Sequence, residues 1–439
     1  MSNSPAEQIL EEARKRFDAA EVFEESGETL SVDFEDNRLK EITTKQHRGV
    51  GLRVIHKGRI GFAATTDLRD PGRLVEMAAA SAQFGDEARF ELPAAPAKVD
   101  TVEGYDKSVL DVTAQQMVDM GRAGLEMSIA AHPDYLYGCG VSRSTHRQRV
   151  LNTAGLDFES STTGMGASVG VQLVSDDGML QVYEYKSWRQ PLDSVEDLAR
   201  TVLDKMVQAR TIVPAGLEVM PMIFVPKSLG NLLGPLTIAL NGKHVQKGSS
   251  VLRDKLGEQV LDERITITDD PTVPFAPGSC ALDDEGIPTR RRHLFDRGMV
   301  GCFTTDLQTA GLLGIEPSGH GFRSYASRPA PGGTNRIVAT GDTTLADMIG
   351  SLERGLIVEQ TLGSGQSNVL AGDFSVNVEL GFLVERGKVR GRVKDCMVAG
   401  NVYELLKDNV EAIGSELQWL GSGCAPPLMI GGMKLAARG

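Results

Sequence analysis

Several features that mark common protein classes are scarce in this sequence of 439 residues. Its five cysteines lie far apart and none forms a C-x-x-C pair, so neither a disulfide framework nor a zinc ribbon is expected. No apolar run reaches the roughly 20 residues that a membrane helix needs. The N-terminus, "MSNSPAEQILEEARKRF", lacks the apolar core of a signal peptide. We therefore expect a cytoplasmic protein without a membrane segment.

Basic residues are also in deficit. The chain has 46 Lys and Arg against 59 Asp and Glu, which gives a formal net charge of −13. Direct binding to nucleic acid depends on neutralising phosphates with Lys and Arg, so no nucleic-acid partner is expected. The glycine-rich "LGSGQSN" lacks the lysine of a phosphate-binding loop.

The seven histidines stand singly in the sequence. Zinc peptidases bind the metal through two histidines about one helical turn apart, with a general base nearby. No two histidines here are three to five residues apart, which excludes a helical zinc pair. Acidic loops at Asp269–Asp270, Asp283–Gly286 and Ala371–Phe374 offer carboxylates for a cation or for acid–base chemistry, but capping of turns is the simpler interpretation.

The chain is longer than the roughly 250–300 residues that one hydrophobic core supports, so two domains are expected. Residues 1–215 alternate helical patterns with runs of short strands, whose predicted turns include "SGE", "EDNR", "HKGR" and "NTAG". This order suggests two related helix-plus-meander units. Two predicted helices begin at Pro5 and at Pro71, and two further ones span Thr113–Ala131 and Asp193–Arg210.

A proline-flanked strand, "TIVPAGLEVMPMIFVPKS", places the domain boundary near residue 215. Residues 216–439 read as a β-rich domain with a few helices, the first over Ser228–Leu240. The expected fold class is α+β, with helices on an antiparallel meander followed by a β-rich domain.

Segments of the second half resemble the TldD/PmbA family. They are "VQKGSSVLRDKLGEQV", "ITDDPTVPFAPGSCALDDEGIPTRRRHLFDRGMV", "PGGTNRIVATGD" and "LGSGQSNVLAGDFSVNVELGFLVERGKVRGRVKDCMVAGNVYELL". The resemblance covers about Leu217 to Gly439 and continues more faintly through "NRLKEITTKQHRGVGLRVIHKGRIGFAATTD". It implies membership of a family with two branches that are thought to pair and to cleave unfolded or leader peptides. The family has also been called modulator of DNA gyrase.

The TldD branch resembles a zinc peptidase, with H-E-x-x-x-H on a helix and a cysteine near the C-terminus, and the PmbA or TldE branch lacks that motif. Aligned on the G-x-S of "KGSS", the histidine positions fall on Leu233 and Ile238, and the glutamate position falls on Gly234. None of these can bind zinc or accept a proton. Gly234 beside Pro235 should also weaken or break the helix. The resemblance therefore implies the PmbA/TldE branch, with no zinc and no peptidase chemistry in this chain.

Such a chain would pair with a TldD-like zinc peptidase subunit, or form a homodimer, and would bind an extended peptide by strand addition. In this alignment His244 is not a ligand, and Cys424 lies roughly where the TldD cysteine would be. The candidate cleft residues are His244, Lys247, Asn335, Gly363, Ser364, Gly365, Gln366, Ser367, Asn368, Asp373 and Cys424.

Two other hypotheses remain open at this point. One is an independent hydrolase with a relocated site around Cys424, His244 or the pair Asp269–Asp270, which requires these side chains to converge in a cleft. The other is a regulator of DNA gyrase, for which DNA contact would require a contiguous basic face.

Overall fold

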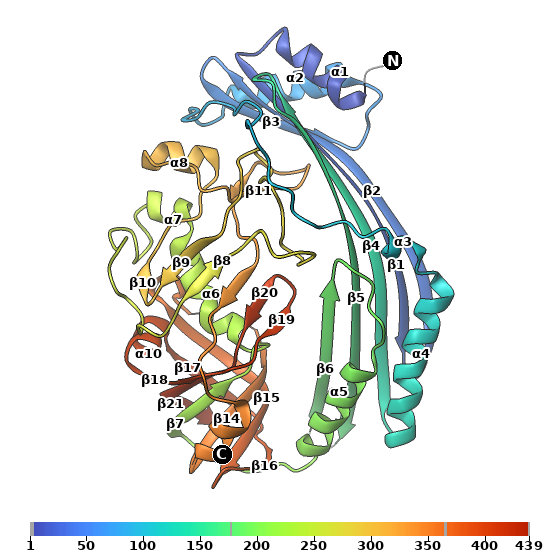
Figure 1. Cartoon of the computed structure of the whole chain (residues 1–439), viewed down its shortest axis with the longest axis vertical. Helices are drawn as coiled ribbons and strands as arrows, with labels where there is room; N and C mark the ends of the chain where they lie inside the picture. The colour runs from blue at the N-terminus through green and yellow to red at the C-terminus, as the bar shows by residue number, and fades with distance from the viewer. Residues whose placement is uncertain (1–3, 176–177, 364–366, 438–439) are drawn as a thin grey trace.

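The computed structural model describes residues 4–175, 178–363 and 367–437. Figure 1 shows a long, arched antiparallel sheet with helices near both of its ends, and a second part on its concave side. The second part contains two larger sheets and the two-stranded sheet β11-β12. Helices and strands are both abundant and most strand pairs are antiparallel, as the α+β assignment predicts. No helix in the described part of the chain is long and apolar enough to cross a membrane.

The arched sheet has the strand order β3-β2-β1-β4-β5-β6. Its strands are β1 (Ala19–Glu35), β2 (Arg38–His56), β3 (Arg59–Thr65), β4 (Leu136–Asn152), β5 (Asp157–Ser175) and β6 (Gly178–Trp188). They reach 19 residues, so the prediction of short strands was wrong. The sheet joins two meanders through β1 and β4, which are its central strands. Each meander is preceded and followed by a helix, which agrees with the two predicted units.

The helices of the first unit are α1 (Pro5–Arg14) and α2 (Pro71–Ala82), and those of the second are α3 (Ser108–Asp111), α4 (Ala114–Ala131) and α5 (Glu196–Ala209). Ser4 and Thr113 begin α1 and α4 with capping boxes, in which the cap hydroxyl and the third helical side chain each accept a backbone N–H. These local signals explain why the predicted starts of α1 and α4 agree with the structure, whereas α5, which has no side-chain cap, begins at Glu196 and not at the predicted Asp193.

The predicted turn at "SGE" is wrong, because Ser26–Glu28 lie inside β1. True turns occur at Asp36–Asn37 and Lys57–Gly58, where positive φ angles suit tight hairpins. Gly27 has a different role: a Cβ there would lie 2.5 Å from Cε1 of His47, so the glycine allows a close approach between strands.

The second part contains a ring of paired strands, because β14 pairs with both β7 and β15. The ring runs β14 (Arg354–Leu362), β7 (Glu218–Phe224), β21 (Leu428–Ala437), β17 (Cys396–Asn401) and β15 (Asp373–Glu385), with β16 (Lys388–Arg392) and β18 (Val410–Ile413) attached. A neighbouring sheet has the order β10 (Met299–Val300), β9 (Arg292–Asp296), β8 (Ile267–Asp269), β13 (Arg336–Val338), β20 (Gly423–Ala425) and β19 (Gln418–Leu420).

The remaining elements connect these sheets. They are β11 (Gly321–Phe322), β12 (Ala330–Pro331), the 3-10 helix η1 (Val369–Ala371), and the helices α6 (Leu229–Leu240), α7 (Gly242–Gln246), α8 (Leu307–Leu313), α9 (Leu345–Ser351) and α10 (Val402–Asp408). The predicted boundary near residue 215 falls between α5 and β7. Because one apolar cluster continues from Val141 and Val182 in the arched sheet to Ile357 and Phe382 in the ring, the division into 1–215 and 216–439 stays a prediction.

Helix α6 is continuous through Pro235, so the predicted break is wrong. Leu232, Leu236 and Leu240 are almost fully buried against the ring and its neighbouring sheet. Tertiary packing supplies most of the stability of a helix in a folded protein, and here it outweighs the cost of the internal proline.

Candidate functional site

Helix α6 holds the three positions that the family resemblance aligns with the zinc-peptidase motif. Leu233, Gly234 and Ile238 are half-exposed, whereas their neighbours Leu232 and Leu236 face the core. None of the three offers a lone pair to a metal or a group that accepts a proton. In the described part of the chain, no cluster of metal-ligating side chains lies at α6.

Polar contacts hold neighbouring segments against α6. The Asn231 amide donates to Oγ1 of Thr361 in β14, and the Arg336 guanidinium in β13 donates to Oγ1 of Thr237. Helix η1 packs against α6, and α7 follows α6 directly. Three segments distant in sequence, β13, β14 and η1, therefore contact the helix, together with α7 that follows it.

Several predicted cleft residues lie in these segments. Gly363 is exposed with a φ of 69°, Ser367 is half-exposed, and Asn368 is exposed just before η1. Asp373 begins β15, is exposed, and accepts a hydrogen bond from the Asn401 amide at 2.9 Å. Ser364, Gly365 and Gln366 lie outside the described residues.

His244 and Lys247 lie in and just after α7, near the C-terminal end of α6. The Nδ1 atom of His244 is 3.3 Å from Oγ of Ser249, within the turn that follows α7. Lys247 is exposed at the end of that helix. The structure thus places both residues beside α6 without bringing them into contact with its outward side.

Asn335 and Cys424 are buried away from solvent. The Asn335 amide donates to the Asp270 carbonyl and to Oγ of Ser279, both at 2.8 Å, and its oxygen accepts the Gly278 N–H. These bonds leave no free polar group for a peptide. Cys424 is 2% exposed in β20, and burial raises the pKa of its thiol to about 11.

Cys424 should therefore react slowly with iodoacetamide in the folded chain. The thiolate is the reactive species, and at neutral pH a pKa of about 11 leaves roughly 300-fold less thiolate than the ordinary pKa of about 8.5. Mass spectrometry of timed alkylation reactions would measure this rate, with the urea-unfolded chain as the matched control. Equal labelling rates in the folded and unfolded chain would contradict the expectation.

The residues of the relocated-hydrolase hypothesis do not form one site. His244 bonds to Ser249, whereas the Asp269 carboxylate accepts the Thr334 N–H at 2.8 Å and lies 3.3 Å from Nε2 of His320. Asp270 accepts the backbone N–H and hydroxyl of Thr272, which is the expected capping of a turn.

A buried Asp–His–Ser series does exist, and sequence spacing gave no signal for it. Nδ1 of His320 is 2.9 Å from Oγ of Ser318, and its Nε2 faces Asp269. The Ser318 hydroxyl already accepts the Thr305 N–H and donates to the Thr305 carbonyl, and all three members of the series are at most 5% exposed. With no access for substrate, this series is structural.

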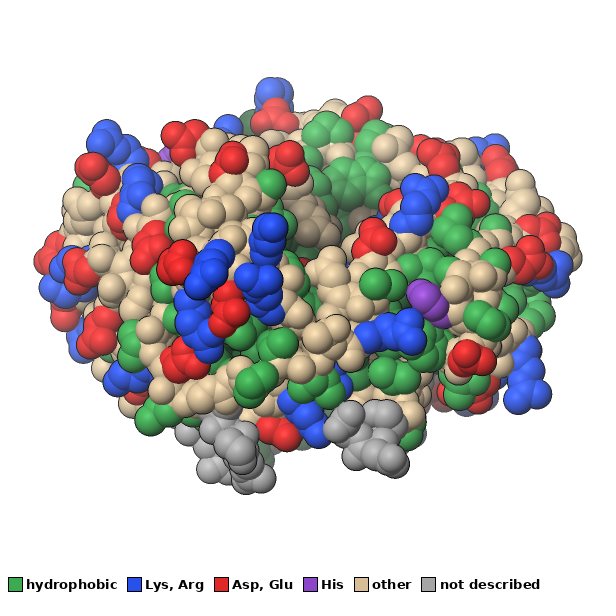
Figure 2. Space-filling model, turned by 90° about the horizontal axis from the view of Figure 1, so that it is seen from below, with side chains coloured by type: hydrophobic (Ala, Val, Ile, Leu, Met, Phe, Trp, Pro, Cys, Tyr) green, Lys and Arg blue, Asp and Glu red, His purple; other side chains and the backbone are tan. Residues whose placement is uncertain are grey.

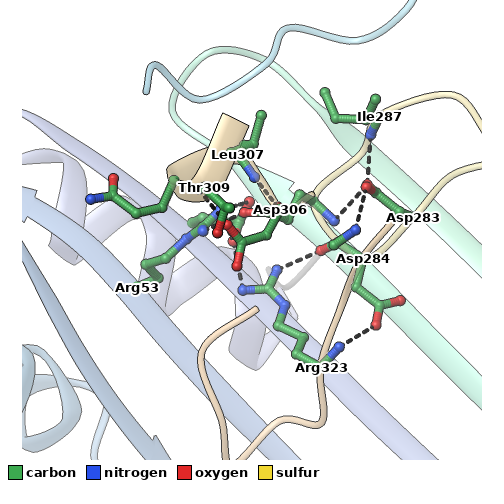
Figure 3. Close-up of polar contacts among 12 residues, drawn as sticks. Arg53, Asp283, Asp284, Ile287, Asp306, Leu307, Thr309 and Arg323 are labelled. Atoms are coloured by element: carbon green, nitrogen blue, oxygen red, sulfur yellow. Dashed lines mark hydrogen bonds and ion pairs between the residues drawn. The ribbon is translucent and has the colours of Figure 1, made fainter. Parts of the chain in front are cut away.

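A second polar cluster joins the arched sheet to the loop before β9 (Figure 3). Asp283 accepts the backbone N–H groups of Glu285, Ile287 and Gly321, which confirms the expected capping of a turn. Its neighbour Asp284 accepts the Arg323 N–H at 2.8 Å.

Glu285 reaches into the arched sheet from this loop. Its carboxylate binds the guanidinium of Arg53 in β2 at 2.5 Å, and Arg53 also binds Glu21 of β1 at 3.0 Å. Arg323 binds the same oxygen of Glu21 at 2.7 Å. These side chains are at most 4% exposed, so buried ion pairs form part of the junction between the two parts of the molecule, together with the apolar cluster that also crosses it.

Comparison with known proteins identifies the family. The profile of the PmbA/TldA metallopeptidase C-terminal domain matches residues 217–437, and that of PmbA/TldA metallopeptidase domain 1 matches residues 20–82. Metalloprotease PmbA of Escherichia coli O157:H7 is 26% identical, over 98% of this chain and 94% of that protein. A metalloprotease of Methanothermobacter thermautotrophicus is 26% identical, over 94% of this chain and 92% of that protein.

Solved structures share the fold over nearly the whole chain. TldE from Thermococcus kodakarensis superposes with a TM-score of 0.91 at 25% identity, covering 99% of this chain and 100% of that one. A Thermotoga maritima protein solved as a candidate modulator of DNA gyrase gives a TM-score of 0.86 at 22% identity, covering 98% and 99% of the two chains. On these matches, the chain belongs to the PmbA/TldD metallopeptidase family.

Proposed function

We propose that this chain is the non-catalytic, substrate-chamber subunit of a TldD/TldE-type metallopeptidase complex that cleaves unfolded or leader peptides. The observation that carries the proposal is the outward side of α6, where Leu233, Gly234 and Ile238 replace two metal ligands and a general base. The likeness to TldE over the whole chain supports it. Zinc at the peptidase position would then belong to a TldD-like partner.

The segments around α6 are suited to a role in the chamber. The exposed or half-exposed residues Gly363, Ser367 and Asn368 lie beside a helix that is uncharged and mostly apolar. Extended peptides are commonly bound through backbone hydrogen bonds and shallow apolar contacts, which do not require one sequence. This combination favours unfolded substrates over a single small molecule.

A surface for the partner subunit is available between the β5–β6 hairpin and the ring. A cavity of about 700 Å³ there is lined by apolar residues, among them Met179, Leu362, Met397 and Ala436, and by the charged residues Glu379, Arg392, Lys394 and Asp395. Met179 is 70% exposed and Leu362 is 60% exposed. Clustered exposed apolar side chains are typical of protein contact surfaces, so we assign this groove to the subunit interface. The same groove could serve a homodimer.

The first test combines the purified chain with a TldD-like zinc peptidase subunit and measures cleavage of an unfolded peptide. We expect cleavage by the mixture, loss of that cleavage with a zinc chelator, and no cleavage by this chain alone. Equal cleavage by the partner in the absence of this chain would refute the accessory role.

The second test addresses the groove. M179E should weaken partner binding by about tenfold or more, since it places a charge at an apolar contact. The matched control is F84E, because Phe84 is also apolar and 90% exposed but lies just after α2, near the opposite end of the arched sheet. Binding constants from isothermal titration would compare the two variants. Equal weakening of partner binding by M179E and F84E would show that the groove is not the interface.

The gyrase hypothesis has less support. Figure 2 shows one face of the molecule, on which Lys and Arg side chains are intermixed with Asp and Glu. A mixed surface of this kind does not favour a DNA backbone. Regulation through protein contact would use the same kind of apolar groove. Copurification from cells would show whether the bound partner is a gyrase subunit or a TldD-like chain.

A further inference from the structure

Two histidines and a glutamate meet on the arched sheet, on three neighbouring strands. In the strand register Gly27 of β1 lies opposite His47 of β2 on one side and His146 of β4 on the other. Glu25 is two residues from Gly27 along β1, so its side chain points to the same face of the sheet. We call Glu25, His47 and His146 the sheet triad.

The ligand atoms of the sheet triad converge on one point. Nε2 of His47 is 3.5 Å and Nδ1 of His146 is 3.9 Å from the same oxygen of Glu25, and all three atoms lie within 4.8 Å of one another. These distances are too long for hydrogen bonds. Ligands bound at about 2.0–2.1 Å to one tetrahedral zinc ion lie roughly 3.3–3.4 Å apart, so small side-chain rotations would complete the geometry.

Gly27 provides the space for this convergence. A Cβ at this position would lie 2.5 Å from Cε1 of His47 and 2.8 Å from the Thr145 carbonyl oxygen. Glycine is unfavourable inside a long strand, and close approach of other groups is one of the few reasons for finding it there. The two imidazole rings lie on either side of it, with centroids 6.1 Å apart and planes inclined by 26°.

Neighbouring groups orient two members of the sheet triad. Nε2 of His146 is 3.4 Å from Oε1 of Gln148, and the Gln148 amide nitrogen donates to Asp284 at 3.0 Å. The donation to Asp284 fixes the amide orientation, so Oε1 accepts a hydrogen bond from the Nε2–H of His146, and the Nδ1 lone pair faces Glu25. The second oxygen of Glu25 accepts the Tyr325 N–H at 2.9 Å. Support of this kind is typical of metal ligands.

The sheet triad is also accessible. The exposed fractions of its side chains are 16% for Glu25, 37% for His146 and 49% for His47. His146 lines two cavities, of about 620 and 680 Å³, so one side of the convergence point is open to solvent. Three protein ligands with an open fourth position are typical of zinc sites that bind water or a small ligand.

We propose that the sheet triad binds a divalent transition-metal ion of the zinc class. The donor set of two imidazoles and one carboxylate suits borderline ions and is a poor match for calcium or magnesium, which prefer oxygen ligands. The site goes beyond the proposed function, because no residue of α6 takes part in it. It differs from the expectation of a metal-free chain, which rested on the spacing of histidines along a helix.

The test is an isothermal calorimetric titration of the full-length, chelator-treated chain with ZnCl₂ at pH 7.5. We expect one equivalent of zinc to bind. H47A and H146A should each weaken binding by about 100-fold or more, because each removes one of three ligands, whereas loss of an outer group alone costs about 10–100-fold. Co²⁺ should bind at the same 1:1 ratio and change the visible absorption spectrum. This change should be absent in both variants.

The matched control is H244A, which removes a histidine of α7 outside the sheet triad. It should bind zinc like the unaltered chain. Circular dichroism without metal checks folding, and if a histidine variant misfolds, E25Q gives the same test because glutamine can still accept the Tyr325 N–H. Failure of the unaltered chain to bind one equivalent, or equal binding by the H47A/H146A double variant, would overturn the proposal.

Discussion

Replacing Arg53 with methionine is expected to lower the free energy of unfolding by about 3–5 kcal/mol. The Arg53 side chain is 4% exposed and binds two carboxylates, those of Glu21 and Glu285, which are both fully buried. The guanidinium also lies 4.8 Å from the centre of the Phe90 ring. Methionine would fill much of the volume but would leave one carboxylate without its cation and the other with Arg323 alone (Figure 3).

Denaturant unfolding monitored by circular dichroism would measure this loss. R147M is the matched control, since Arg147 binds Glu159 with side chains that are 63% and 42% exposed. An exposed pair of this kind contributes less than about 1 kcal/mol. An R53M variant no less stable than R147M would contradict the assignment of Arg53 to the junction.

A second substitution separates charge from packing. Adding E285Q to R53M should recover part of the lost stability, because it removes one unpaired buried charge while its amide oxygen can still accept the Leu307 N–H. If the loss were due to packing alone, E285Q would give no recovery. The double-mutant cycle therefore tests the electrostatic explanation directly.

Local signals in the sequence predicted the helices well. Ser4 and Thr113 cap α1 and α4 through groups three residues away, so the information is contained in a short segment. The hairpin turns at Asp36–Asn37 and Lys57–Gly58 are likewise local. Two of the errors, a turn at Gly27 and a break at Pro235, come from local propensities that tertiary contacts override. The third, the prediction of short strands, follows from the false turn, which divided β1 in two.

The sites could be predicted only where the family resemblance supplied a register. Leu233, Gly234 and Ile238 were assigned in this way, because apolar residues on a helix carry no functional signal of their own. His47 and His146 are brought together by strand register, and Asp269 and His320 by the path of the folded chain between residues far apart in sequence. No spacing rule along one helix or loop could have detected these contacts.

The pH dependence of stability should change when Asp284 is replaced by asparagine. Burial raises the pKa of Asp284 to about 6, from an ordinary value of about 3.9. A folded state that raises the pKa of an acid binds the proton more tightly than the unfolded state. The resulting stabilisation is fully present below about pH 4 and is lost as the pH rises through about 6.

Between about pH 7.5 and pH 5 the unaltered chain should therefore gain about 1.4 kcal/mol of stability relative to D284N. The quantity compared is the change in stability between the two pH values, not the stability at one pH. D284N also loses a hydrogen bond at every pH, because one amide oxygen cannot replace a carboxylate that accepts from both Gln148 and Arg323. Denaturant curves at both pH values, with a chelator present, would measure the gain. D134N is the matched control, since Asp134 is exposed, and it should leave the pH dependence unchanged. Parallel pH profiles for D284N and the unaltered chain would show that Asp284 is ionised across this range in the folded protein, and the junction would then hold a buried carboxylate whose charge is fully compensated by Arg323.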